Sequence, residues 1–185
     1  EFHCHDKNGK TLFSFHVNPF EEINPDAYED NGNIFAVSDI EGNLPALVDL
    51  LKAGKVMNTQ YQWSFGKGHL VLVGDFFDRG YQVTECLWLI YKLEQEAKKA
   101  GGMVHFIIGN HELMNLHGDI RFVRTKYKTN ADLIGKSYND LYKENTILGR
   151  WLRTKPSMLR IRDVLFVHAG LSNNFFNHKF LRLWD

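Results

Sequence analysis

The sequence has little of what marks several large classes of protein. It holds only two cysteines, Cys4 and Cys86, which form no spaced pair, so neither a disulfide framework nor a thiolate zinc site is indicated. Its longest apolar runs, such as residues 86–91, are far shorter than the roughly 20 residues that cross a bilayer. We therefore expect no insertion into a membrane.

The sequence also has no excess of charge of either sign. Twenty-two lysines and arginines balance 22 aspartates and glutamates, so no overall field attracts the chain to nucleic acid or anionic lipid, and we expect no nucleic-acid partner. No leader segment is visible, but the chain begins with Glu1 rather than methionine, which leaves the compartment open.

The remaining composition is that of a globular protein. Hydrophobic residues make up 44% of the 185 residues and aromatic residues 14%, enough for a sizeable core. Residues 1–32 are polar and contain an Asn-Gly turn between two alternating apolar runs, which predicts an N-terminal hairpin or extension. Residues 33–185 are predicted to form the main domain.

The main domain alternates between two kinds of pattern. Four short apolar runs, each bounded by turn residues, predict buried strands over residues 34–37, 69–73, 104–108 and 164–167. Helical spacing marks residues 44–51 and 84–100, and residues 119–156 are polar and mostly helical in pattern. This alternation predicts an α/β fold, a parallel sheet with covering helices.

Polar side chains follow every one of these four strands. Asp39 follows the first, Asp75 the second, Asn110 the third and His168 the fourth. Ligands of open α/β sheets bind at the carboxyl ends of the strands, so these groups should converge on one rim. Carboxylate, amide and imidazole groups are ligands for hard or borderline divalent metals, and a carboxylate shared by two ions is typical of two-metal hydrolases.

Three motifs around these residues resemble a known family. Gly-Asp-x-x-Asp-Arg-Gly at 74–80, Gly-Asn-His-Glu at 109–112 and His-Ala-Gly at 168–170 occur in the order found in calcineurin-like metallophosphoesterases, specifically the phosphoprotein phosphatase branch. Residues 109–123 are similar to the bacterial and Shewanella-like phosphatases of that branch. The resemblance implies a layered metallophosphoesterase sheet with flanking helices and a metal site at the strand ends.

The resemblance also implies a role for each matching residue. The metal ligands would be Asp39, Glu41, Asp75, Asn110 and His168, with Asp75 shared between two ions. His111 would protonate the leaving oxygen, Asp78 would orient His111, and Arg79 and Asn110 would bind the phosphate. Polar caps and an exposed ion pair would explain these residues singly, but not their occurrence together.

Two departures from the family pattern stand out. Glu41 occupies a position where the family commonly has histidine, and it is either a metal ligand, a carboxylate behind the ligands, or a sign that one metal position is lost. A ligating Glu41 would harden the site toward Mn²⁺ or Mg²⁺, so a Glu41→His variant should differ in metal preference. The family pattern also continues with a histidine well beyond His168, so we expect the printed chain to be a piece of a longer protein.

The leading functional interpretation is a metal-dependent phosphomonoester hydrolase, resembling protein Ser/Thr phosphatases. The resemblance implies attack by a hydroxide held between two divalent ions, with Mn²⁺ expected first and Fe, Zn or Mg as alternatives. The expected partner is a phosphorylated protein or a small phosphate ester. Two alternatives remain: a phosphoesterase for nucleotides or other small molecules, and a non-catalytic relic of the fold that binds phosphorylated groups.

Overall fold

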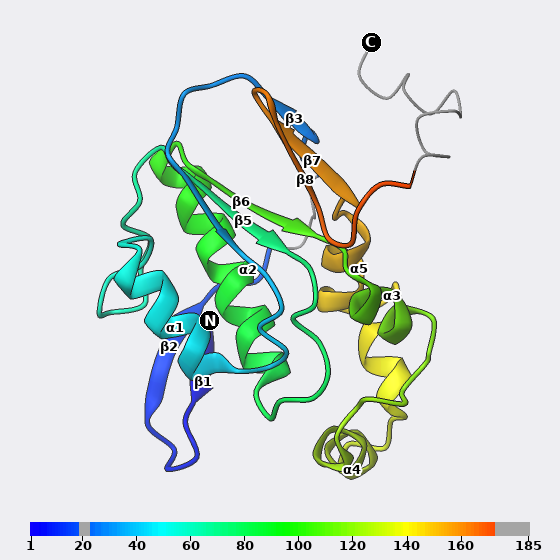
Figure 1. The fold of residues 1–185 in the computed structure, drawn as a ribbon. Helices are drawn as coiled ribbons and strands as arrows, with labels where there is room; N and C mark the ends of the chain where they lie inside the picture. The colour runs from blue at the N-terminus through cyan, green and yellow to red at the C-terminus, as the bar shows by residue number, and fades with distance from the viewer. Residues whose placement is uncertain (19–22, 173–185) are drawn as a thin grey trace.

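A computed structural model describes residues 1–18 and 23–172 of the chain (Figure 1). The strands of this part form a two-stranded sheet and two three-stranded sheets. Residues 173–185, the end of the expected main domain, lie outside the described residues. No helix of the described part is long and apolar enough to span a membrane.

The central sheet consists of β4 (Ile34–Val37), β5 (His69–Val73) and β6 (Met103–Ile107), all parallel, with β5 in the middle. This confirms the first three predicted strands, within one residue for β6. Side chains alternate along β5: Leu70 and Leu72 belong to the main core cluster, whereas Val71 belongs to a second one. The middle strand is therefore buried on both faces, as its uninterrupted apolar run predicted.

Two helices follow the first two strands of this sheet. The helix α1 (Leu44–Ala53) starts at Asn43, whose side chain accepts a hydrogen bond from the backbone N–H of Ala46. The helix α2 (Val83–Ala100) crosses behind the sheet in Figure 1 and ends at Gly101, which has left-handed backbone angles. Both helices were predicted, and each differs from its predicted range at one end, by two residues for α1 and by one for α2.

The fourth predicted strand lies elsewhere. The strand β8 (Val164–Val167) pairs antiparallel with β7 (Met158–Ile161), and β7 pairs with the short β3 (Ala27–Tyr28) in a second sheet. Two corrections follow: β8 is not part of the parallel sheet, and its exposed Val164 and Leu165 show that it is not buried on both faces.

The two three-stranded sheets pack against each other. Their shared core contains Val71 and Ile107 from the parallel sheet and Leu159 and Ile161 from β7. The molecule is thus layered, with helices on one face of the parallel sheet and the second sheet on the other, which confirms the predicted fold class.

Helices also fill most of the segment before β7, as expected. They are α3 (Asn110–Leu116), α4 (Thr125–Leu133), the 3-10 helix η1 (Tyr138–Tyr142) and α5 (Ile147–Arg153). The helix α3 starts shortly after β6, at a motif for which no helix was predicted. It places the residues of the Gly-Asn-His-Glu motif on the first turn of a helix.

The predicted N-terminal hairpin consists of β1 (Phe2–His5) and β2 (Thr11–Phe15), paired antiparallel. It contributes to the main core, because the Phe15 ring stacks on Trp88 of α2, with 4.8 Å between the ring centroids. The domain boundary between residues 32 and 33 stays a prediction.

A buried pair of histidines between the two sheets should make stability depend on pH. Burial, and to a smaller extent the neighbouring His69, lowers the pKa of His105 to about 3. Since the unfolded side chain titrates near 6.5, the unfolded state binds more protons below that pH, and this contribution to stability is lost as the pH falls from about 6.5 to about 3.

The variant His105→Gln keeps an N–H donor but cannot titrate. Relative to the variant, the parent should lose roughly 2–4 kcal/mol of its free energy of unfolding between pH 7 and pH 4, measured by urea unfolding. A difference that stays constant over this range would contradict the assignment.

Candidate active site

The site is built from the loops that leave β4 and β5. Hydrogen bonds join the two loops, from the backbone N–H of Asp39 to the carbonyl of Gly74 (3.1 Å) and from that of Glu41 to the carbonyl of Asp75 (3.0 Å). Several residues of the two loops have positive φ angles, between 49° and 66°: Asp39, Glu41, Asp75, Asp78 and Arg79. Such angles are costly for residues with side chains, and their clustering is typical of functional sites.

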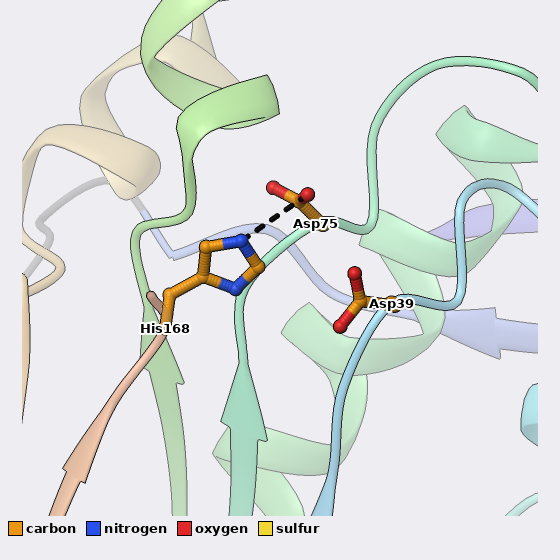
Figure 2. Close-up of side chains that lie close together, drawn as sticks. All are labelled: Asp39, Asp75 and His168. Carbon is orange, nitrogen blue, oxygen red and sulfur yellow. Dashed lines mark ion pairs between the residues drawn. The ribbon is translucent and has the colours of Figure 1, made fainter. Parts of the chain in front are cut away.

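Three of the predicted metal ligands meet at the ends of three strands. Asp39 follows β4, Asp75 follows β5 and His168 follows β8, and Figure 2 shows their side chains pointing toward one another. One ligand atom from each lies within 4.8 Å of the others. The strand ends therefore bring two carboxylates and one imidazole to the same point, as the sequence predicted.

The tautomer of His168 makes its outer nitrogen available to a cation. Its Nδ1 donates to the carbonyl of Val73 (2.7 Å), which in a neutral ring leaves Nε2 with a free electron pair. This Nε2 lies 3.0 Å from Oδ1 of Asn110 and 3.2 Å from Oδ2 of Asp75. In the neutral ring three acceptor atoms therefore face one another, an arrangement that a metal ion would satisfy.

Negative charge gathers at this point. Burial lowers the pKa of His168, but the bond to Val73 and the nearby carboxylates, Asp75 first and then Asp39, together raise it above its ordinary value. The same potential would attract a divalent cation. The residues present therefore fit the metal centre that the family motifs imply.

Glu112 fixes the backbone of the loop after β5. It is fully buried and accepts hydrogen bonds from the backbone N–H groups of Asp75, Phe76 and Gly109, each 2.8 Å long. Burial raises the pKa of Glu112, and these bonds oppose the rise. The side chain thus connects the loop after β5 to the start of α3, which gives the last residue of the Gly-Asn-His-Glu motif a structural role.

The predicted acid and its partner lie beside the predicted metal ligands. Nδ1 of His111 is 2.7 Å from Oδ2 of Asp78, and both side chains are buried. Nε2 of His111 lies 4.0 Å from Oδ2 of Asp75. An imidazole held in this way presents Nε2 toward the metal ligands, where a proton could be given to a leaving oxygen.

Arg79 and Glu41 form an ion pair with each other at the rim of the site. Glu41 is not part of the cluster formed by Asp39, Asp75 and His168. The Arg79 side chain is 53% exposed and also has Nη2 at 3.4 Å from Nε2 of His111. A pair this exposed is worth little, so a phosphate could displace Glu41 from the guanidinium.

Replacement of Glu41 by glutamine separates the open alternatives for this residue. If Glu41 acts only on Arg79, the Glu41→Gln variant should bind Mn²⁺ as the parent does, while KM for a phosphate ester falls about 2- to 5-fold because the competing carboxylate charge is gone. If Glu41 is a ligand, Mn²⁺ affinity should fall instead. Isothermal titration with Mn²⁺ and steady-state kinetics give the two readouts on one sample.

Two residues of the site were missed from the sequence. Asn115 hydrogen-bonds to Asp78, and Tyr138 hydrogen-bonds to Asn115. Asn115 lies four residues after His111 on α3, and that spacing places both on one helix face, a signal that could have found it. Tyr138 comes from a separate helix and has no local signal.

Comparisons with known proteins agree with this geometry. Residues 32–184 match the family model described as calcineurin-like phosphoesterase, so the chain belongs to that family. It is 30% identical to Shewanella-like protein phosphatase 1 of Plasmodium berghei over 88% of this chain and 44% of that protein. It is 28% identical to a symmetrical bis(5'-nucleosyl)-tetraphosphatase of Chromobacterium violaceum, over 81% of this chain and 47% of that one.

A solved structure extends the likeness to three dimensions. The cold-active protein-tyrosine phosphatase of a psychrophilic Shewanella species has a TM-score of 0.82 and 45% sequence identity, over 84% of this chain and 47% of that one. The matches confirm the predicted family and its Shewanella-like branch. The chain spans about half the length of the relatives that it matches.

Proposed function

We propose that this chain provides the active site of a metal-dependent phosphomonoester hydrolase. The observation that carries the proposal is the placement of the His111–Asp78 pair beside the convergent ligand atoms of Asp39, Asp75 and His168. A ligand cluster alone would support binding, whereas a proton donor with its own orienting carboxylate is useful only for bond cleavage.

The proposed ligands are Asp39, Asp75, Asn110 and His168, with Asp75 shared between two ions and Glu41 left to the test above. Their oxygen and nitrogen atoms suit a hard or borderline ion, which favours Mn²⁺ over softer metals, with Fe, Zn or Mg as alternatives. When bound, two divalent cations neutralise phosphate charge and lower the pKa of water.

The chain's own residues would handle the phosphate and the leaving group. Arg79, once released by Glu41, can offer two N–H groups to two phosphate oxygens, and the Asn110 amide at the start of α3 would bind the phosphate with it. The leaving alkoxide needs a proton. Asp78 would stabilise His111 in its imidazolium form, which can donate the proton from Nε2 and become neutral imidazole.

A phosphorylated protein is the leading substrate. The names of the matched relatives, protein phosphatase and protein-tyrosine phosphatase, support this class, and they add phosphotyrosine to the phosphoserine and phosphothreonine expected from the motifs. The nucleotide alternative rests on the tetraphosphatase relative.

Hydrolysis of four substrates in Mn²⁺ tests the proposal: phosphate release from phosphoserine, phosphothreonine and phosphotyrosine peptides, and cleavage of diadenosine tetraphosphate into mononucleotides. The proposal expects a kcat/KM for at least one peptide that is at least about 10-fold above that for the nucleotide. The opposite order would move the function to small molecules. Binding of the peptides without hydrolysis of any substrate would favour the non-catalytic relic.

A further inference from the structure

The Asp78 carboxylate is a buried charge with few partners. Its side chain is fully enclosed, and a single oxygen, Oδ2, receives both of its hydrogen bonds, from Nδ1 of His111 (2.7 Å) and Nδ2 of Asn115 (3.0 Å). The other oxygen, Oδ1, is buried and has no hydrogen-bond partner among the described residues. A buried carboxylate is costly unless hydrogen-bonded, so Asn115 supplies half of what holds Asp78 in place.

The chemistry of its neighbours fixes the orientation of the Asn115 amide. Its Nδ2 faces two groups that can only accept, Oδ2 of Asp78 and the backbone carbonyl of His111 (2.9 Å). Its Oδ1 must then accept, and the Tyr138 hydroxyl donates to it over 2.8 Å. A flipped amide would place its oxygen against these two acceptors and lose both bonds.

Tyr138 anchors this chain of hydrogen bonds in the core. It starts η1, is 5% exposed, and packs its ring against Tyr142 at 5.5 Å between centroids. Burial, followed by nearby Tyr142 and Asp78, raises the pKa of Tyr138 well above its ordinary value, which keeps the hydroxyl protonated and able to donate. The network therefore runs from a rigid core residue on η1 to the ring of His111 on α3.

We propose that Asn115 and Tyr138 are positioning residues for proton donation: together they hold Asp78, and through it the His111 imidazole, in the orientation that delivers a proton to the leaving oxygen. The inference rests on the proposed hydrolase function. Neither residue touches the reacting atoms, so its loss should affect only the steps that depend on a correctly aimed His111.

The first test observes the His111 ring directly and needs neither metal nor turnover. The Nδ1–H proton of His111 is hydrogen-bonded to Asp78 and gives an NMR signal in a ¹⁵N-labelled sample. The signal is assigned by its loss in His111→Ala. We expect its exchange with solvent to accelerate about 10-fold or more in Asn115→Leu and a few-fold in Tyr138→Phe, the milder change. Tyr91→Phe, which removes another buried hydroxyl on α2, should leave the signal unchanged.

The second test varies the need for a proton. Phenyl phosphate has a poor leaving group, whereas the more acidic nitrophenol of p-nitrophenyl phosphate departs with little help. In Mn²⁺ we expect Asn115→Leu to lower kcat about 10-fold for phenyl phosphate and about 2-fold for the nitrophenyl ester, with KM unchanged. Tyr138→Phe should also lower kcat more for phenyl phosphate than for the nitrophenyl ester.

Two results would overturn the inference: an Nδ1–H signal that neither variant alters, or equal losses of kcat on both esters, which a purely structural role would give. Failure of the proposed function has a different outcome. A parent that hydrolyses neither ester would reject the hydrolase, while the exchange rates of the His111 proton would still decide whether Asn115 and Tyr138 hold it.

Discussion

Replacing Asp75 with asparagine should abolish metal-dependent hydrolysis, with a fall in kcat/KM on the order of 10³-fold or more. Asp75 is 5% exposed, and its Oδ2 faces Nε2 of His168 at 3.2 Å. Asparagine has the same shape and can still accept from the backbone N–H of His111 over 3.0 Å, so the loop should keep its conformation. The variant removes one charge from the centre of the ligand set and turns an acceptor into a donor.

The same variant should separate metal binding from folding. In EDTA we expect Asp75→Asn to unfold at the same temperature as the parent or a higher one, because one of several neighbouring carboxylate charges is gone. Added Mn²⁺ should raise the Tm of the parent but not of the variant, since only a state that binds the ion gains stability from it. Asp49→Asn, on an exposed position of α1, is the matched control and should respond to Mn²⁺ like the parent. A Tm rise of equal size in both aspartate variants would remove Asp75 from the metal site.

Replacing His111 with alanine should lower kcat for phenyl phosphate by about 10²- to 10⁴-fold, the usual contribution of a positioned acid, and lower it much less for p-nitrophenyl phosphate. The imidazole is the group whose Nε2 lies beside the metal ligands while Nδ1 is held by Asp78. Mn²⁺ binding should persist, because the predicted ligands are unchanged.

The loss of His111 should also affect stability. Asp78 would keep only Asn115 as a donor, so we expect the free energy of unfolding to fall by about 1–3 kcal/mol in His111→Ala. His111→Asn, which offers a donor near the same place, should recover part of that stability without recovering activity. His117→Ala, an exposed histidine just after α3, is the control. Activity of His111→Ala within a few-fold of the parent on phenyl phosphate would exclude the assigned role.

Much of the fold follows from local pattern. The strands β4, β5 and β6 and the helices α1 and α2 were predictable because each carries a periodic apolar pattern that ends in a turn or cap, such as Gly101 after α2. The partner of β8 was not. Val164–Val167 pairs with Met158–Ile161, which lies only two residues before it, but that strand was not predicted, and the sheet that the two strands join also contains β3, far away in the sequence.

The candidate site also has a part that was predictable from the sequence and a part that was not. Asp39 and Asp75 were predictable because the carboxyl ends of parallel strands meet at one edge of a sheet, whereas His168 reaches the same point from the second sheet. The partners of these residues were not predictable. The pairing of Glu41 with Arg79 and the reach of Tyr138 to Asn115 depend on how loops pack in three dimensions. Side-chain networks between distant elements are where the structure adds most to the sequence.

Hydrolysis of p-nitrophenyl phosphate by this chain, with Mn²⁺ varied from an excess of EDTA to saturation, tests the central claim most directly. If the strand-end cluster of Asp39, Asp75 and His168 is a catalytic metal site, turnover is absent in EDTA, rises with Mn²⁺ to saturation, and is lost in Asp75→Asn but not in Asp49→Asn. A folded protein whose phosphatase activity is zero at every Mn²⁺ concentration, or is the same with and without the ion, would contradict that claim.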